Sequence, residues 1–396
     1  MKIVSRPNDT LTYYSKLFDV PLILLEQANQ GFDAEVLPRG QTVQIPGYAL
    51  FFESSPRHTL KTIAIERNIL IDQLLVTNQL VSPDELSHYD QIIIPEPVND
   101  FIITDCDHYT SAKLERDIQK LMAVYPFMRS QSAGSTVMGK TIPELGIGTG
   151  ETHVHLNGSF HANEWITTAV IMRFLNEYLL ALTNQLPIRG MNLHAYFLQT
   201  HLSVVPMVNL DGVDLVIEGV EAAGAYQTEV LTLNNQSNDF ANWKANITGV
   251  DLNNQYPACW DTEAKRKPDS PQPRDYPGSH PLTEPEALAM QALTAKRDFK
   301  RVTALHTQGK EIYWGFADLE PSDAKAIARE YCRVSGYRPV QNLDSYAGFK
   351  DWFIQEFRRP GYTVELGAGV NPLSFEQFES IYQEALGIML ANLYVS

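Results

Sequence analysis

The chain has 396 residues, 44% of them hydrophobic and 20% charged, which is typical of a folded globular protein and not of a disordered one. Its formal net charge of -16 at pH 7 argues against nucleic acid as a partner, because binding the phosphate backbone needs a basic face. The three cysteines, Cys106, Cys259 and Cys332, are too dispersed for a disulfide framework, and we expect buried free thiols.

The first residues, MKIVSRPNDTLTYY, have neither the apolar core nor the small-residue cleavage site of a secretory signal. We also find no apolar run that approaches the roughly 18 residues needed to cross a bilayer. The sequence therefore predicts synthesis in the cytoplasm and no transmembrane segment.

Residues 9–30 and 58–79 form an internal repeat at an offset of 49. The register holds without a gap in these pairs: Thr10 and Thr59, Leu11 and Leu60, Leu25 and Leu74, Asn29 and Asn78, Gln30 and Gln79, Leu37 and Leu86, Ile45 and Ile94, Pro46 and Pro95. Each copy predicts a strand, two short helices and a closing strand that ends at proline. We therefore predict two small α+β domains of βααβ type, at 1–48 and 49–98.

This repeat resembles the LysM module, with its Thr-Leu first helix, its Leu-x-x-x-Asn second helix and its Ile-Pro closing strand. The resemblance implies that residues 1 to about 98 bind the N-acetylglucosamine-containing glycan of peptidoglycan or chitin. Two small packing domains without a ligand are the alternative.

From 101 to 396 the chain alternates between helical and extended patterns, which predicts an α/β domain with a mostly parallel or mixed sheet. Helices are expected at 111–126, 163–184 and 375–395. Strands are expected at 153–160, 191–199, 202–208, 301–307 and 362–368. The stretch 231–285 is rich in Asn, Pro and Asp and predicts a long functional loop.

Four metal-competent side chains stand near the ends of predicted strands. His161 and Glu164 are three residues apart where a strand passes into a helix, a spacing that places both on one side. His306 ends the strand RVTALH, and Glu365 ends the strand YTVE. Two histidines and one glutamate are the ligand count of a catalytic zinc with one open position, which leaves Glu365 to move the proton of a bound water.

Three of these residues also have a plain structural interpretation: His161 as a helix-start residue, His306 as a core histidine and Glu365 as a salt-bridged surface group. His153 and His155 alternate within one strand, so we expect a packed or hydrogen-bonded pair, and the same holds for His194 and His201.

Six motifs occur in the order of the zinc carboxypeptidase family: HANE (161–164), NLDGV (209–213), GVDLNNQYP (249–257), LHTQG (305–309), GFKDW (348–352) and VELG (364–367). The resemblance covers roughly 105–396. It implies a three-layer domain with a central mixed sheet and one zinc ion. It also implies a water-promoted peptidase mechanism, with His161, Glu164 and His306 as ligands and Glu365 as general base and acid.

The sequence departs from the family where arginines are usual. Asn254 follows Asn253 where an arginine grips the substrate's terminal carboxylate, and Asn163 and Thr248 stand at two further such positions. Loss of the guanidinium at 254 removes a bidentate partner for a carboxylate, so ordinary C-terminal specificity is not expected.

Two weaker candidates for substrate binding follow from the same comparison. Tyr346 would supply the phenol that caps the family's pocket, or it is a packed aromatic. Arg274 would replace a missing cation, or it is a solvated loop residue.

A LysM pair joined to this catalytic domain resembles the bacterial γ-D-glutamyl-L-diamino acid endopeptidases. The implied substrate is the γ-D-glutamyl bond to meso-diaminopimelate or L-lysine in peptidoglycan stem peptides. Action on the cell wall or on spore peptidoglycan during sporulation is the corresponding expectation. A zinc carboxypeptidase or deacylase with another substrate, and a wall-binding protein with an inactive catalytic domain, are the alternatives.

Overall fold

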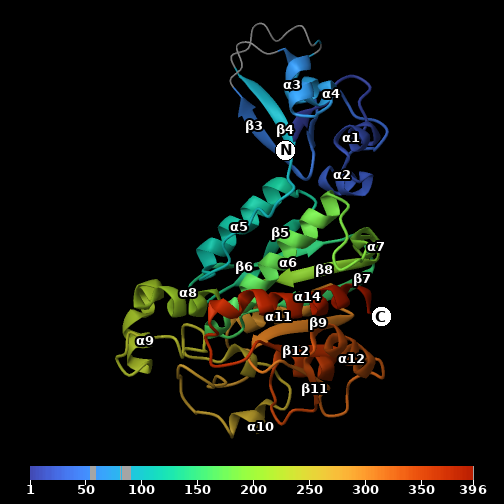
Figure 1. Cartoon of the computed structure of the whole chain (residues 1–396). Helices are drawn as coiled ribbons and strands as arrows, with labels where there is room; N and C mark the ends of the chain where they lie inside the picture. Colours follow the sequence, from blue (N-terminus) through green and yellow to red (C-terminus); the bar gives the residue numbers. More distant parts are fainter. Residues whose placement is uncertain (54–58, 81, 83–90, 396) are drawn as a thin grey trace. The chain divides into compact units, whose positions relative to one another are not determined.

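The computed structural model describes residues 1–53, 59–80, 82 and 91–395 (Figure 1). The chain divides into two compact units. The first consists of Met1–Ile102, Asp117–Arg129 and Asn176–His194, and the second of Ile103–Arg116, Ser130–Leu175 and Ala195–Ser396.

The first unit contains two copies of a strand–helix–helix–strand arrangement, as the repeat predicts. In each copy the two strands pair antiparallel. The first copy consists of β1 (Lys2–Val4), α1 (Leu11–Phe18), α2 (Leu22–Ala28) and β2 (Thr42–Gln44). The second consists of β3 (Tyr48–Glu53), α3 (Leu60–Glu66), α4 (Ile71–Thr77) and β4 (Ile92–Pro97).

Equivalent residues of the two copies make equivalent hydrogen bonds. Thr10 and Thr59 each cap the N-terminus of the first helix, where the hydroxyl accepts from the backbone N–H three residues on. The Nδ2 of Asn78 donates to the carbonyls of Leu74 and Ile93 at 2.8 Å, and its Oδ1 accepts from Ile93 N at 2.8 Å. Asn29 makes the matching set with Leu25 and Gln44. The repeated asparagine therefore joins the end of the second helix to the closing strand in both copies.

The second unit is built on an eight-stranded mixed sheet in the order β11-β10-β12-β9-β7-β8-β6-β5. Its strands are β5 (Arg129–Ser135), β6 (Thr141–Ile147), β7 (Thr152–Asn157), β8 (Thr200–Val205), β9 (Arg301–Thr307), β10 (Glu311–Trp314), β11 (Arg338–Gln341) and β12 (Gly361–Leu366). The central strands β8, β7, β9 and β12 run parallel, whereas β6 and β10 pair antiparallel with them. The mixed sheet confirms the expected class.

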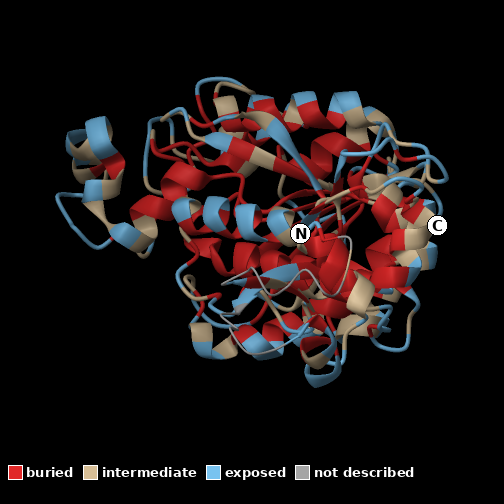
Figure 2. Ribbon diagram, turned by 90° about the horizontal axis from the view of Figure 1, so that it is seen from above, coloured by how far each residue is buried: buried red, intermediate tan, exposed pale blue. Residues whose placement is uncertain are grey.

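Helices cover both faces of this sheet. At the start of β12, Tyr362 donates a hydrogen bond to the carbonyl of Ala324 in α12 (Ala324–Ser335), whereas the neighbouring Gly361 packs against α13 (Phe349–Phe357). Since successive strand residues point to opposite faces, α12 and α13 lie on opposite sides. All seven residues of β9 are buried, as expected for a strand covered on both faces. Figure 2 shows buried residues in red and exposed residues in pale blue along the same helices. The edge strands β5 and β11 are mostly exposed.

The remaining helices are α5 (Ser111–Val124), α6 (Ile166–Thr183), α7 (Leu193–Gln199), α8 (Leu210–Glu218), α9 (Gln227–Leu233), α10 (Trp260–Ala264), α11 (Pro285–Arg297) and α14 (Phe378–Tyr394). Helices expected at 111–126, 163–184 and 375–395 correspond to α5, α6 and α14.

Three expectations need correction. The stretch 191–199 is the helix α7 and not a strand. Cys106 is buried, but Cys259 is exposed and Cys332 half-buried, although all three are free thiols. One described helical stretch, Ala162–Thr183, is long and apolar enough by composition to cross a membrane, but 89% of that window is buried inside the protein, which is the behaviour of a core helix.

Candidate active site

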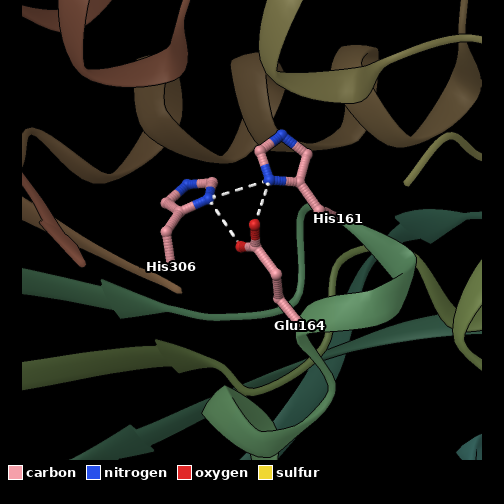
Figure 3. A group of neighbouring side chains, drawn as sticks. All are labelled: His161, Glu164 and His306. Carbon is pink, nitrogen blue, oxygen red and sulfur yellow. Dashed lines mark hydrogen bonds and ion pairs between the residues drawn. The ribbon is translucent and has the colours of Figure 1, made fainter. Parts of the chain in front are cut away.

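Two histidines and a glutamate converge at one edge of the sheet (Figure 3). His161 Nδ1 lies 2.8 Å from Glu164 Oε1, and His306 Nδ1 lies 3.0 Å from Glu164 Oε2. The two Nδ1 atoms are 3.2 Å apart. All three residues are buried, and one ligand atom of each lies within 4.8 Å of the others.

The sheet brings these groups together through its parallel strands. His306 is the last residue but one of β9, and Glu365 occupies the matching position of β12 as its register partner. Strand β7, which pairs parallel with β9, ends at Asn157 and leads into the turn that carries His161. His161 then precedes the short 3₁₀ helix Ala162–Glu164. The site therefore lies at the carboxyl edge of the strands, where open α/β sheets commonly place ligands.

The electrostatics of the cluster suit a cation. Burial raises the pKa of Glu164, but the two imidazoles outweigh it and hold this pKa at about 2. Burial lowers the pKa of His161, but the Glu164 carboxylate reverses this and raises it to about 9. Burial lowers the pKa of His306. Two ring nitrogens at 3.2 Å share at most one proton between them, and a divalent ion can replace that proton.

The surrounding groups fit a metal site as well. His306 Nε2 is buried without a hydrogen-bond partner among the described residues. His161 Nε2 lies 3.3 Å from Asp251 Oδ1, the carboxylate–histidine arrangement that orients metal ligands. Asn371 Nδ2 reaches Glu164 Oε1 at 3.4 Å and the carbonyl of Thr307 at 2.9 Å. A His₂Glu set with supported side chains is suited to one zinc ion.

A cavity of about 170 Å³ lies beside the cluster and contains several of the predicted residues. Its lining includes His161, Asn253, Asn254 and Glu365. Glu365 is half-buried and does not belong to the ligand cluster. Burial and the charge of Glu164 raise the pKa of Glu365 to about 8. It therefore lies in the wall of the same cavity as His161, beside His306 in the sheet.

Other candidates lie elsewhere. Tyr346 is absent from the described lining of this cavity, and its ring carries the Arg266 guanidinium at 4.9 Å. Arg274 is exposed, donates to the carbonyl of Asn242 at 3.1 Å and is absent from the described lining of this cavity. Thr248 donates to Glu284 Oε2 at 2.9 Å and serves a loop contact.

The histidines expected to be structural have partners outside the cluster. His155 Nδ1 lies 3.1 Å from Ser203 Oγ, and its ring stacks on Phe299. His153 Nδ1 lies 2.9 Å from the carbonyl of Arg297.

Sequence reasoning missed the charged residues of the cavity. Three lysines line it: Lys244, Lys267 and Lys350. Lys244 Nζ lies 2.6 Å from Asp251 Oδ2 and 2.9 Å from Asp275 Oδ1. One sequence feature could have identified Lys350 as a candidate: charged residues interrupt an apolar run in FKDWF at 349–353.

Comparison with known proteins agrees with this geometry. Residues 114–386 match the model of the zinc carboxypeptidase family. The chain is 48% identical over 396 residues to "Gamma-D-glutamyl-L-diamino acid endopeptidase 1" of Lysinibacillus sphaericus, with 100% of both chains covered. It is 47% identical over 291 residues to the uncharacterized protein YqgT of Bacillus subtilis, covering 72% of this chain and 77% of that one.

A solved structure supports the fold. The structure of bovine thrombin-activatable fibrinolysis inhibitor, in complex with a tick carboxypeptidase inhibitor, has a TM-score of 0.56 at 18% identity, covering 73% of this chain and 96% of the other. The sequence matches, the mixed sheet and the metal-competent His-Glu-His cluster all support the same assignment. The chain belongs to the zinc carboxypeptidase family of metallopeptidases.

Proposed function

We propose that this protein hydrolyses the γ-D-glutamyl bond to a diamino acid, meso-diaminopimelate or L-lysine, in peptidoglycan stem peptides. His161, Glu164 and His306 hold one zinc ion, and Glu365 is the general base and acid. The observation that carries the proposal is the 48% identity to a γ-D-glutamyl-L-diamino acid endopeptidase over the whole of both chains.

The positions of the side chains suggest a separate catalytic role for the zinc ligands and for Glu365. Zinc bound by the His₂Glu set would polarise the scissile carbonyl and lower the pKa of water toward about 7. Glu365, at the cavity wall, takes the proton from the attacking water and passes it to the leaving amine. Its half-buried position and raised pKa suit a group that must both accept and return a proton.

The cavity contains cationic side chains that can bind the carboxylates of the proposed substrate. A γ-linked D-glutamate keeps its α-carboxylate free, and the diamino acid brings at least one more. The chain as a whole carries a net charge of -16, whereas three lysines line this cavity beside three carboxylates, Asp251, Asp351 and Glu365. Asn254 stands where an arginine would favour an ordinary C-terminal carboxylate, which disfavours the alternative of a protein carboxypeptidase.

Incubation with L-Ala-γ-D-Glu-meso-diaminopimelate tests the activity. We expect release of free diaminopimelate that stops on addition of a chelator and in Glu365→Gln. Cleavage of ordinary C-terminal residues or of acyl groups alone would favour the alternative carboxypeptidase or deacylase. A Glu365→Gln protein with full activity would contradict the assigned base.

We also propose that residues 1–48 and 49–98 are LysM modules that bind the N-acetylglucosamine-containing glycan of peptidoglycan. The repeated βααβ arrangement supports this assignment. Two weak modules tethered to the catalytic domain would raise the local concentration of a polymeric substrate. The corresponding site of action is cell-wall or spore peptidoglycan.

Sedimentation of the full-length Glu365→Gln protein with glycan strands stripped of stem peptides tests the anchor. Binding that chitin oligomers compete away supports it. Binding to intact peptidoglycan but not to stripped strands would assign the affinity to the catalytic domain instead.

A further inference from the structure

A second cavity, of about 290 Å³, lies in the second unit and shares no described lining residue with the cavity beside the metal cluster. Two residues of its wall connect it to the proposed ligand Glu164. Trp165 follows Glu164 directly in the chain. Pro372 follows Asn371, whose Nδ2 reaches Glu164 Oε1 at 3.4 Å. The first cavity adjoins the cluster at His161 instead, so each of two ligands has a cavity beside it.

Aromatic rings form one wall of this second cavity. The Trp165 indole, only 5% exposed, stacks with the His108 imidazole at 5.3 Å and with the Phe375 ring at 6.3 Å between centroids. The indole N–H of Trp165 has no hydrogen-bond partner among the described residues. A buried tryptophan N–H usually has a partner, so this wall can accept a ligand that brings an acceptor oxygen.

The rest of the lining combines an apolar surface with a polar rim. The apolar part includes Val216 and Ile217 of α8 and the buried Leu373. The polar part includes Asp107 and His108, whose side chains are 42% and 66% exposed and therefore lie toward the mouth. An apolar pocket with a few polar groups is typical of a small-molecule site.

The volume of the cavity limits the size of the ligand. A cavity of about 150 Å³ holds one benzene molecule. A space of about 290 Å³ has roughly twice that capacity, which suits one N-acetylated sugar ring.

The proposed substrate has to extend from the metal cluster in two directions. The diamino acid lies on the leaving side of the scissile bond, and D-glutamate and L-alanine lie on the acyl side. In peptidoglycan this L-alanine is joined by an amide bond to the lactyl group of N-acetylmuramic acid. Two extended residues span about 7 Å, so the sugar has to lie outside the cluster but close to it.

We propose that the second cavity binds the N-acetylmuramoyl sugar to which the stem peptide is attached. This inference rests on the proposed function and names the group recognised on the acyl side of its substrate. The exposed His108 ring packs against the apolar face of the sugar, and the Trp165 N–H donates to a sugar oxygen. The Asp107 carboxylate at the rim accepts from a hydroxyl group. The enzyme then acts on stem peptides before they are detached from the glycan.

A detached stem peptide is the competing occupant. It carries the ammonium group of L-alanine in place of the sugar, and this ammonium group could pair with Asp107. The two occupants differ in charge and in size, so substrates that change one property at a time separate them.

Steady-state kinetics with three substrates make this comparison: L-Ala-γ-D-Glu-meso-diaminopimelate with a free amino terminus, with an N-lactoyl group, and with an N-acetylmuramoyl group. The lactoyl substrate lacks both the ammonium group and the sugar. For the native protein we expect kcat/KM to rise about tenfold from the lactoyl to the muramoyl substrate, the effect of one or two contacts of this kind. Equal values for these two substrates, or the highest value for the free amine, would overturn the inference.

Two variants assign the gain to the cavity. Trp165→Phe removes the N–H and keeps an aromatic ring, and His108→Ala removes the exposed ring. Each should lower the ratio of muramoyl to lactoyl kcat/KM toward one. His280→Ala is the matched control, because His280 is also exposed but is absent from the described lining of either cavity, and this ratio should not change. A gain that persists in both cavity variants belongs to another sugar-binding part, such as the first unit, and contradicts the assignment.

Calorimetric titration of the full-length Glu365→Gln protein gives a readout that does not depend on turnover. N-acetylmuramoyl-L-alanyl-D-glutamate should bind about tenfold more tightly than L-alanyl-D-glutamate, and the additional Trp165→Phe change should remove the difference. Equal affinities would overturn the sugar site and leave the proposed function standing. Failure of the native protein to cleave any of the three substrates, with sugar-dependent binding intact, would overturn the proposed function and not the sugar site.

Discussion

Replacing Asp251 with asparagine tests whether the carboxylate behind His161 helps to hold the zinc ion. Asp251 Oδ1 lies 3.3 Å from His161 Nε2, and the Asp251 side chain is fully buried. Burial alone would raise its pKa, but Lys244 and His161 hold the pKa of Asp251 well below its usual range, so it is charged. An asparagine keeps the Oδ1 atom that accepts from Asn253 N at 3.0 Å, so the local turn should persist.

The expected loss of zinc affinity can be estimated from the effect of similar carboxylate partners in other metal sites. Mutation of the carboxylate partner of a metal-bound histidine typically costs ten- to hundredfold in metal affinity, which is about 1.4 to 2.7 kcal/mol. Asparagine keeps the Oδ1 atom that faces His161 but removes its negative charge, so the variant tests the charge of the partner. A competition titration between the protein and a chelator of known zinc affinity measures this change.

Asp275→Asn is the matched control, because Asp275 pairs with the same Lys244 at 2.9 Å but has no described contact with His161. A zinc Kd for Asp251→Asn within twofold of the native value would refute the reasoning. Equal weakening in both variants would place the effect in Lys244 instead.

Three further predictions follow from other parts of the structure. Glu286 is fully buried and accepts from Val137 N at 2.9 Å, and burial raises its pKa from 4.5 to about 7, so the folded state binds this proton more tightly than the unfolded chain. Stability should therefore fall as the pH rises from 4.5 to 7, by up to about 3 kcal/mol, and urea unfolding should show that Glu286→Gln removes this dependence; an unchanged pH profile would count against a buried acid. Asn29→Ala and Asn78→Ala should each destabilise the first unit by about 1–3 kcal/mol through the loss of matching hydrogen bonds, and a large effect at one position alone in thermal unfolding would contradict their equivalence. His306→Ala should abolish stoichiometric zinc in elemental analysis, and retained zinc would exclude this residue as a ligand.

Several strands of the second unit could be predicted from the sequence because they are apolar runs, rich in β-branched residues, that end in a polar residue. RVTALH and YTVE show this pattern, and the structure places His306 and Glu365 side by side in register. The error at α7 has a physical cause, because the apolar stretch 191–199 is too short for periodicity to separate helix from strand. Its buried residues Leu193 and Phe197 are four apart, which is the helical spacing.

The polar lining of the cavity could not be predicted in the same way. Lys244 and Lys267 belong to the stretch 231–285, which contains α10, whereas Lys350 belongs to α13. Their proximity depends on how these two parts of the chain pack. Family resemblance pointed to positions where arginines are usual, and it directed attention to Arg274 and Tyr346. The cationic side chains in the described lining of the cavity are lysines: Lys244, Lys267 and Lys350.

The pairing of β9 with β12 makes the proposed catalytic geometry dependent on sheet alignment. His306 and Glu365 are directly opposite in parallel strands, so both point to the same face only while that alignment holds. A single residue inserted into β12 ahead of Glu365 would turn this carboxylate to the other side of the sheet without removing any functional group. The enzyme would then retain every reactive side chain and its metal ligands, yet lose its proton acceptor.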